Sequence, residues 1–158
     1  SIVYKGFVFI GLIKVGDDPF VIEYNCRMGD PETEVVLPRL ENDLVELFVR
    51  LNEGRLREVQ CRHAAAAATT IMLVSGGYPG TYQKGFPIQG AEGISDSIIF
   101  HAGTALKNDQ LVTNGGRVIA ITSLAATLQE ALKTSNANAA NINFDGKYFR
   151  KDIGWEFK

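Results

Sequence analysis

Three polar residues at alternating positions, Glu23, Asn25 and Arg27, have the types and spacing to do chemistry together. Alternate residues of a strand share a face and lie about 6.6 Å apart along the chain. A carboxylate and an amide oxygen at that spacing suit a hard cation such as Mg²⁺, and a neighbouring arginine can bind a phosphate or carboxylate through two hydrogen bonds. This row of three side chains therefore fits a site for phosphoryl transfer. The alternative is the ordinary polar face of an antiparallel strand.

The elements that must position this row begin with two strands. Residues 7–13 and 20–24 are rich in β-branched and aromatic side chains, and the cluster 16–19 has turn composition. Two such stretches joined by a short turn predict an antiparallel hairpin. Strict alternation places Cys26 on the apolar face, so we expect a buried thiol there.

Two helical stretches follow the row. Asp30 is a candidate N-cap and Pro31 fits the first helical position, so we expect a helix from Pro31 that Pro38 interrupts. Between residues 40 and 51, leucine and phenylalanine recur with amphipathic helical spacing, and Gly54 is a plausible C-cap.

The second half of the chain is predicted to form short strands separated by glycine-rich turns. The stretch 55–63 is polar and irregular, and we take it as a linker. Beyond it we expect a strand over 64–74, a helix over 123–134, and an Asp145-Gly146 turn. Further short strands are expected at 86–88, 98–100, 111–112, 117–121 and 142–144. The expected fold class is α+β.

Composition limits the classes of partner. The 158 residues carry 16 Lys and Arg against 18 Asp and Glu, a net charge of −2, which gives no support for nucleic-acid binding. Two cysteines fit a reducing cytoplasm and exclude a cysteine-rich zinc site. The apolar run Gly6–Ile13 is too short to span a bilayer, which needs about 20 residues. A start on Ser1 that leads at once into a strand suggests a fragment.

Several motifs in order resemble one family. Arg27 to Glu34 matches the pattern Arg-apolar-Gly-Asp-Pro-Glu-x-Glu/Gln of glycinamide ribonucleotide synthetase, the phosphoribosylamine–glycine ligase family of the ATP-grasp superfamily. Further stretches similar to that family are 36–40, 43–47, 74–80, 100–104, 113–118 and 149–154. The resemblance implies that residues 1–54 end an ATP-grasp domain and that residues 64–158 form a small C-terminal antiparallel β domain with a packed helix.

The resemblance also implies a reaction. ATP activates the glycine carboxylate as an acyl phosphate, and the amine of 5-phosphoribosylamine attacks it to give glycinamide ribonucleotide, ADP and phosphate, in de novo purine (IMP) biosynthesis. Glu23 and Asn25 resemble the family's Mg²⁺ or Mn²⁺ ligands. Arg27 resembles the arginine that holds transferring phosphate or substrate carboxylate. Asp30 and Glu32 belong to the signature and are candidate substrate contacts, with helix capping as the alternative role for Asp30.

Other candidate residues have plainer readings. The glycine-rich stretch 75–80 lacks the Lys-Ser/Thr pair of a phosphate-binding loop, so we interpret it as a turn. The stretch 113–117 could offer backbone N–H groups and Arg117 to a ribose phosphate, or it could be a hairpin turn at Asn-Gly. We expect His101 to be a hydrogen-bonded structural residue and His63 to be exposed.

Three hypotheses remain open at this stage. The first is a C-terminal fragment of the ligase, inactive alone because the family needs an upstream sugar-phosphate domain and nucleotide-binding lobes. The second is part of another ATP-grasp enzyme, a carboxylase or carbamoyl-phosphate synthetase relative, which the Gly-Asp-Pro-Glu continuation disfavours. The third is a non-enzymatic module that binds metal or an anion.

Overall fold

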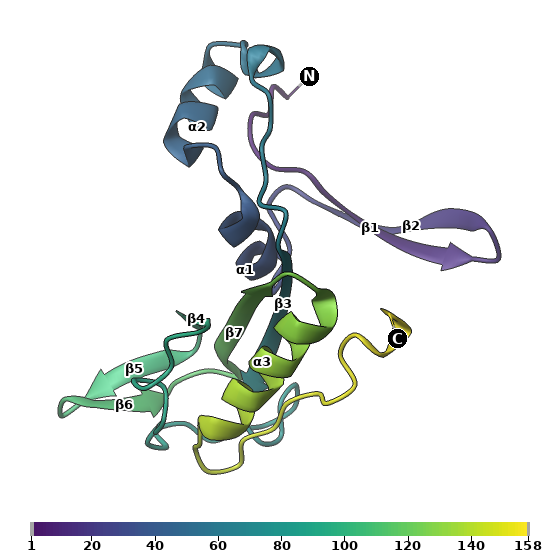
Figure 1. The fold of residues 1–158 in the computed structure, drawn as a ribbon. Helices are drawn as coiled ribbons and strands as arrows, with labels where there is room; N and C mark the ends of the chain where they lie inside the picture. Colours follow the sequence, from purple (N-terminus) through teal and green to yellow (C-terminus); the bar gives the residue numbers. More distant parts are fainter. Residues whose placement is uncertain (1, 158) are drawn as a thin grey trace. The chain divides into compact units, whose positions relative to one another are not determined.

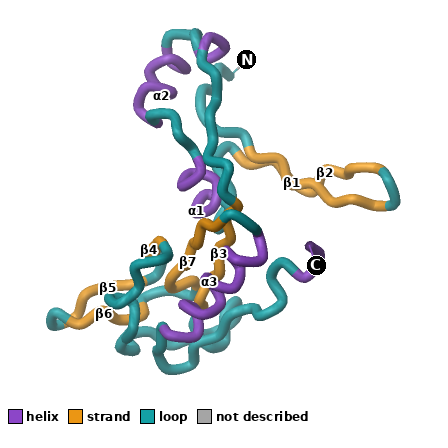
Figure 2. The backbone as a smooth tube through the Cα atoms, in the orientation of Figure 1, coloured by secondary structure: helices purple, strands orange, loops and turns teal. Residues whose placement is uncertain are grey.

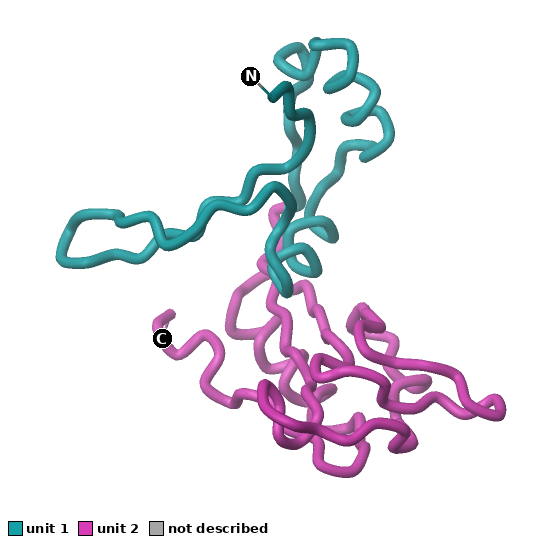
Figure 3. Tube along the Cα trace, turned by 180° about the vertical axis from the view of Figure 1, so that it is seen from behind, with its two compact units in different colours: residues 1–64 teal, residues 65–158 magenta. Residues whose placement is uncertain are grey.

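The structure is a computed structural model that describes residues 2–157 (Figure 1). It contains helices and strands (Figure 2), and the strands pair antiparallel. The chain forms two compact units, residues 1–64 and residues 65–158 (Figure 3), which we call unit 1 and unit 2. The α+β class is thus confirmed. The finer division at residues 54 and 64 stays a prediction. No helix among the described residues is long and apolar enough to cross a membrane.

Unit 1 starts with the expected hairpin. Strands β1 (Phe9–Val15) and β2 (Asp18–Asn25) pair antiparallel, from Val15 opposite Asp18 at the turn to Phe9 opposite Asn25 at the open end (Figure 1). Gly16 has φ +63°, a backbone conformation that glycine adopts without steric cost in a tight hairpin turn. The register shifts between Gly11 and Leu12, where β2 carries one extra residue, Ile22.

Both faces of this hairpin are exposed. Ile22 is 65% exposed and Tyr24 is 69% exposed, and large apolar side chains of both strands share this state: Ile10, Leu12, Ile13, Val15, Phe20 and Val21. Cys26 is exposed too, so the prediction of a buried thiol was wrong. The prediction that one side of the hairpin is apolar is correct, but no other described residues cover that side.

The helices of unit 1 are short. Helix α1 (Thr33–Val36) runs into a 3₁₀ turn η1 (Leu37–Arg39) that contains Pro38, so the predicted interruption is confirmed. The prediction of a start at Pro31 with Asp30 as the cap was wrong. The N-cap is Glu32, and no side chain caps it. Thr33 N, which an Asp30 cap would bind, already donates to Gly29 O at 3.0 Å.

Helix α2 (Leu44–Asn52) is capped at both ends by local residues. The Asp43 side chain accepts a hydrogen bond from Glu46 N at 2.9 Å. Gly54, with φ +73°, directly follows the C-cap residue Glu53, which confirms the predicted helix end. A 3₁₀ turn η2 (Leu56–Glu58) follows, and the backbone then returns to the rest of unit 1, because Ala64 N donates to Arg39 O at 2.8 Å.

Unit 2 is built on two small antiparallel sheets. The first has the strand order β3-β7-β4, and the second is the hairpin β5-β6. The strand bounds are β3 (Ala67–Val74), β4 (Ile98–His101), β5 (Thr104–Lys107), β6 (Gln110–Thr113) and β7 (Arg117–Ala125). Every buried apolar residue among residues 2–157 lies in unit 2, and the largest of them come from β3, β7 and the end of α3: Ile71, Leu73, Ile119, Ile121 and Ile142.

Helix α3 (Leu128–Asn141) lies against β3 and β7 (Figure 1) and is anchored there by buried hydroxyl groups. Ser135 Oγ donates to Ser123 Oγ of β7 at 2.8 Å and lies 2.9 Å from Thr69 Oγ1 of β3. A prediction of helix over 123–134 was wrong at both ends. β7 continues to Ala125, and a capping box formed by Thr127 and Glu130 starts the helix later.

Three other local predictions were wrong for one reason. Residues 86–88 and 142–144 are not strands. Each stretch holds one residue of an isolated bridge, Pro87 with Val112 and Asn143 with Gln89. The stretch 114–115 is not a hairpin turn, because β6 pairs with β5 while β7 pairs with β3 and β4. Partner choice is a long-range property that local turn composition does not contain. A last 3₁₀ turn, η3 (Trp155–Phe157), ends the described chain.

Candidate metal and phosphate site

The open end of the hairpin brings Glu23 and Asn25 together, as their alternation predicts. Asn25 Nδ2 donates a hydrogen bond to Glu23 Oε1 at 3.0 Å, so the carboxylate and the amide share one side of β2. Glu23 lies opposite Gly11, and a Cβ atom at Gly11 would lie 3.0 Å from Glu23 Cγ. The absence of a side chain at residue 11 therefore leaves room for the glutamate.

A β-bulge directly precedes this pair. Ile22 is the extra residue of β2, and Glu23 is the next residue. Bulges bend a strand and redirect the side chains beside them, and they occur often near functional sites. The bulge was not predictable from the alternation of residues 20–27, because it depends on how β1 pairs with β2.

Arg27 lies just beyond β2, outside the Glu23–Asn25 pair. Its side chain is exposed, and Nη1 donates to the neighbouring carbonyl Met28 O at 3.0 Å. No hydrogen bond joins it to Glu23 or Asn25 among residues 2–157. A guanidinium carries five N–H donors, so the one bond to Met28 leaves a planar group able to take an oxyanion.

Asp30 and Glu32 lie in the turn between β2 and α1. The Glu32 carboxylate covers Gly29, since a Cβ atom at Gly29 would lie 2.4 Å from Glu32 Oε2. Thr33 Oγ1 donates to Gly29 O at 2.6 Å, which tightens the same turn. The Gly-Asp-Pro-Glu segment is thus a compact turn, and a side chain at residue 29 would displace the Glu32 carboxylate from its present position.

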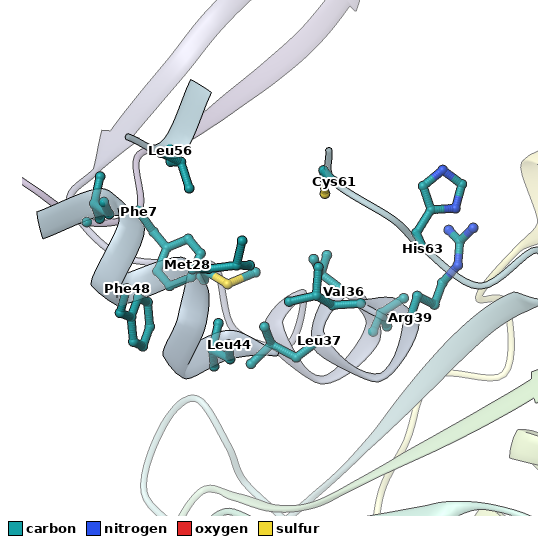
Figure 4. A pocket seen from close by; sticks show the side chains of 15 residues that line it. Phe7, Met28, Val36, Leu37, Arg39, Leu44, Phe48, Leu56, Cys61 and His63 are labelled. Carbon is teal, nitrogen blue, oxygen red and sulfur yellow. The ribbon is translucent and has the colours of Figure 1, made fainter. Parts of the chain in front are cut away.

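An apolar pocket of about 480 Å³ opens in unit 1 (Figure 4). Sequence reasoning missed it, although the amphipathic stripe of residues 40–51 was the available signal. At one end of the pocket, Arg39 Nη2 and His63 Nδ1 both contact Ala64 O, at 3.1 and 3.2 Å, and His63 is exposed as predicted. The other lining side chains are chiefly aliphatic or aromatic and include Phe7, Met28, Leu37, Leu44 and Phe48.

Unit 2 contains the remaining predicted site residue, Arg117, at the start of β7. Arg117 Nε donates to the hydroxyl of Tyr78 at 3.1 Å. Tyr78 belongs to the glycine-rich stretch 75–80, and Ser75 Oγ donates to Gly115 O at 2.8 Å. A Cβ atom at Gly116 would lie 2.2 Å from the Tyr78 ring. The two glycine-rich motifs therefore pack on each other, which supports the interpretation of 75–80 as a structural turn.

Glycine backbones also touch at two places in these loops. A Cβ atom at Gly103 would lie 2.6 Å from Gly115 Cα, and one at Gly76 would lie 2.8 Å from Gly146 O. Both contacts are between backbones rather than side chains. These contacts exclude a side chain at Gly76, Gly103 and Gly115, whereas Gly146 has room for a Cβ atom but a φ of +71° that favours glycine.

Several other titratable groups of unit 2 have structural partners. His101 Nδ1 lies 3.2 Å from Thr104 Oγ1, as expected for a hydrogen-bonded residue. Lys147 Nζ donates to the carbonyls of Ala139 and Ile142 at the end of α3, and burial lowers the pKa of this ammonium group. Hydrogen bonds from Arg150 lower the pKa of the Asp152 carboxyl.

The donor set of the Glu23–Asn25 pair fits Mg²⁺ or Mn²⁺. Rotation of the Asn25 amide exchanges its nitrogen and oxygen, so the pair offers a carboxylate and an amide oxygen together. Within residues 2–157 no group of three or more His, Cys, Asp or Glu residues could hold a metal. A cation at this pair would therefore need waters or substrate phosphates as further ligands, which is the usual habit of Mg²⁺.

Comparison with known proteins identifies the family. Residues 68–156 match the model described as "Phosphoribosylglycinamide synthetase, C domain", and the chain belongs to this family. A phosphoribosylamine–glycine ligase of Caldanaerobacter subterraneus is 40% identical over 153 residues, covering 97% of this chain and 37% of the relative. A trifunctional purine biosynthetic protein, adenosine-3, of Gallus gallus is 43% identical over 158 residues, covering 98% of this chain and 16% of the relative.

A solved structure supports the same assignment. The crystal structure of phosphoribosylamine–glycine ligase from Thermotoga maritima matches with a TM-score of 0.78 and 36% identity, over 92% of this chain and 36% of that one. The chain thus spans little more than a third of the length of these single-function relatives, so the activity that their names state belongs to longer proteins.

Proposed function

We propose that this chain supplies the site that binds metal and phosphate in a phosphoribosylamine–glycine ligase acting in the cytoplasm. The reaction joins glycine to 5-phosphoribosylamine and converts ATP to ADP and phosphate through a glycyl phosphate. The names of the relatives support this proposal, and so does the Glu23–Asn25 pair at the end of β2. The 158-residue chain alone is expected to be inactive, because it matches only 37% of the length of such a relative.

Glu23 and Asn25 would hold Mg²⁺ or Mn²⁺. The bound cation would neutralise charge on nucleotide phosphates during phosphoryl transfer. The protein's own contribution is to hold the two oxygen donors on one side of a strand, with Gly11 leaving room for the glutamate. Because the two side chains lie within hydrogen-bonding distance of each other, a cation would require chiefly the rotation of the Asn25 amide that turns its oxygen toward the metal.

Arg27 would hold the oxyanion. Its planar guanidinium can bind a transferring phosphate or the glycine carboxylate bidentately, which a lysine cannot do. Asp30 and Glu32, in the next turn, are proposed as contacts to the amine or hydroxyl groups of substrates, since carboxylates accept such hydrogen bonds. Arg117 in unit 2 is proposed as a contact to the ribose phosphate, on the strength of its charge and its glycine-rich setting alone.

A chimera provides the test. Residues 1–158 would replace the matching part of the Escherichia coli K12 relative, which is 44% identical over 156 residues. We expect glycine-dependent ADP formation with 5-phosphoribosylamine, and a loss of roughly 100-fold or more in the Glu23→Gln variant, because a metal's charge stabilisation is worth several kcal/mol. Glu41→Gln, at an exposed position of unit 1, is the matched control. Full activity of Glu23→Gln would contradict the metal assignment.

A further inference from the structure

The backbone pairing of the hairpin ends at the candidate site, and the side chain of a tyrosine links the two chain segments beyond it. The last pair of β1 and β2 is Phe9 with Asn25. Beyond that pair, the hydroxyl of Tyr4 lies 2.9 Å from Phe7 O and 2.7 Å from Cys26 O. The side chain of Tyr4 thus joins the two chain segments where backbone hydrogen bonds between the strands have stopped.

Gly6 makes room for this arrangement. A Cβ atom at residue 6 would lie 2.5 Å from the Tyr4 hydroxyl and 2.9 Å from Cζ of its ring. A side chain at residue 6 would therefore displace the Tyr4 hydroxyl from this position. Glycine at residue 6 is compatible with the observed place of the hydroxyl.

The carbonyl that Tyr4 contacts lies between two proposed site residues. Cys26 O is part of the peptide that leads into Arg27, and Asn25 is the residue before Cys26. Both faces of the hairpin are exposed, so packing does little to hold this strand end in place. A hydrogen bond to Cys26 O restricts the orientation of the peptide, and with it the directions of the Asn25 and Arg27 side chains.

We propose that Tyr4 is a positioning residue for the Glu23–Asn25–Arg27 site, acting through its hydroxyl on the Cys26 carbonyl. The inference rests on the metal role proposed above for Glu23 and Asn25. A hydroxyl has one hydrogen, which Phe7 O and Cys26 O share as acceptors, so Tyr4 links the segment before β1 to the segment after β2. The alternative role is a purely structural staple that closes the hairpin without affecting the site.

Paramagnetic broadening separates these roles. Mn²⁺ alone is titrated into the uniformly ¹⁵N-labelled 158-residue chain, and the broadening of amide signals of residues 23–27 gives a local dissociation constant. In Tyr4→Phe we expect that constant to rise about fivefold, the equivalent of one ordinary net hydrogen bond. Tyr24→Phe is the matched control, because the exposed Tyr24 hydroxyl makes no hydrogen bond within residues 2–157.

The outcomes are distinguishable. If the unaltered chain shows no local broadening at residues 23–27, the metal proposal fails, and the positioning role falls with it. If broadening occurs and Tyr4→Phe binds Mn²⁺ as tightly as Tyr24→Phe does, only the positioning role is overturned. A staple would shift the amide signals of residues 7–9 and leave the Mn²⁺ constant unchanged. Gly6→Ala, which displaces the hydroxyl while keeping it, is expected to weaken Mn²⁺ binding as Tyr4→Phe does.

Discussion

Arg150 and Asp152 form a two-bond pair close to the chain's C-terminal end. Arg150 Nε and Nη2 donate to the two carboxylate oxygens of Asp152 at 3.0 and 2.8 Å. These hydrogen bonds favour the charged carboxylate and lower its pKa, and they raise the pKa of the guanidinium. Both side chains are exposed, so the pair organises the segment locally and contributes little to stability.

The pair makes a pH prediction whose sign is fixed. A depressed carboxyl pKa adds stability above the unfolded-state pKa, and that stability is lost as the pH falls through the folded-state pKa. We expect the Asp152 carboxyl to titrate below the ordinary Asp value when followed by ¹³C NMR. Arg150→Gln should raise the pKa of Asp152 toward that ordinary value, whereas Lys151→Gln should have little effect. An Asp152 pKa that Arg150→Gln leaves unchanged would contradict the assignment.

At the residue scale, the sequence predicted which side chains of the candidate site lie together, but not how the hairpin pairs and packs around them. Strand alternation correctly places Glu23 and Asn25 on one side. It could not predict that Ile22 forms a bulge or that Cys26 is exposed, because both depend on what lies beside and above the strand. The Tyr4 hydroxyl reaches Cys26 O across 22 positions of sequence, and no local pattern indicates such a contact.

At the scale of elements, the start of α3 shows a signal that was present but not used. Thr127 and Glu130 fit the Ser/Thr-x-x-Glu capping pattern, and the structure forms both of its hydrogen bonds. Leucine spacing alone moved the predicted helix five residues too early. Capping residues mark a helix end better than apolar periodicity does, because a strand such as β7 can also carry apolar residues up to its last residues.

The capping box predicts a measurable loss of stability. Thr127→Ala removes the acceptor for Glu130 N and the partner of the Glu130 carboxylate. We expect the free energy of unfolding to fall by about 1 kcal/mol, measured by urea denaturation with circular dichroism. Thr81→Ala, at an exposed loop position, should change it by less than about 0.5 kcal/mol. Equal values for the two variants would contradict the role of the cap.

At the scale of the whole molecule, the two units differ in how much apolar surface they bury. Unit 2 holds all the buried apolar residues described, and most of them belong to α3, β3 and β7. In unit 1 the helices bury no residue, and the hairpin is exposed on both faces. Hydrophobic burial is the main favourable term in folding, so unit 2 carries most of the stability.

Amide hydrogen exchange tests this difference. We expect amides of β1, β2 and α2 to exchange at least roughly 100-fold faster than those of β3 and β7, because segments with few buried contacts open with small free energies. The measurement is exchange followed by NMR on the 158-residue chain at one pH and temperature. Equal protection in both units would mean that unit 1 gains stability from contacts other than apolar burial.

The close contacts between glycine backbones in unit 2 mean that residues far apart in the sequence are expected to be retained together during evolution. Gly103 meets Gly115, and Gly76 meets Gly146, through main-chain atoms that no substitution elsewhere can shorten. A side chain at residue 76, 103 or 115 would meet peptide backbone, which no second substitution removes, and one at residue 146 would strain a backbone with φ +71°. Descendants that keep these loops are expected to inherit the four glycines together, and a lineage that loses one must rebuild the loop around it.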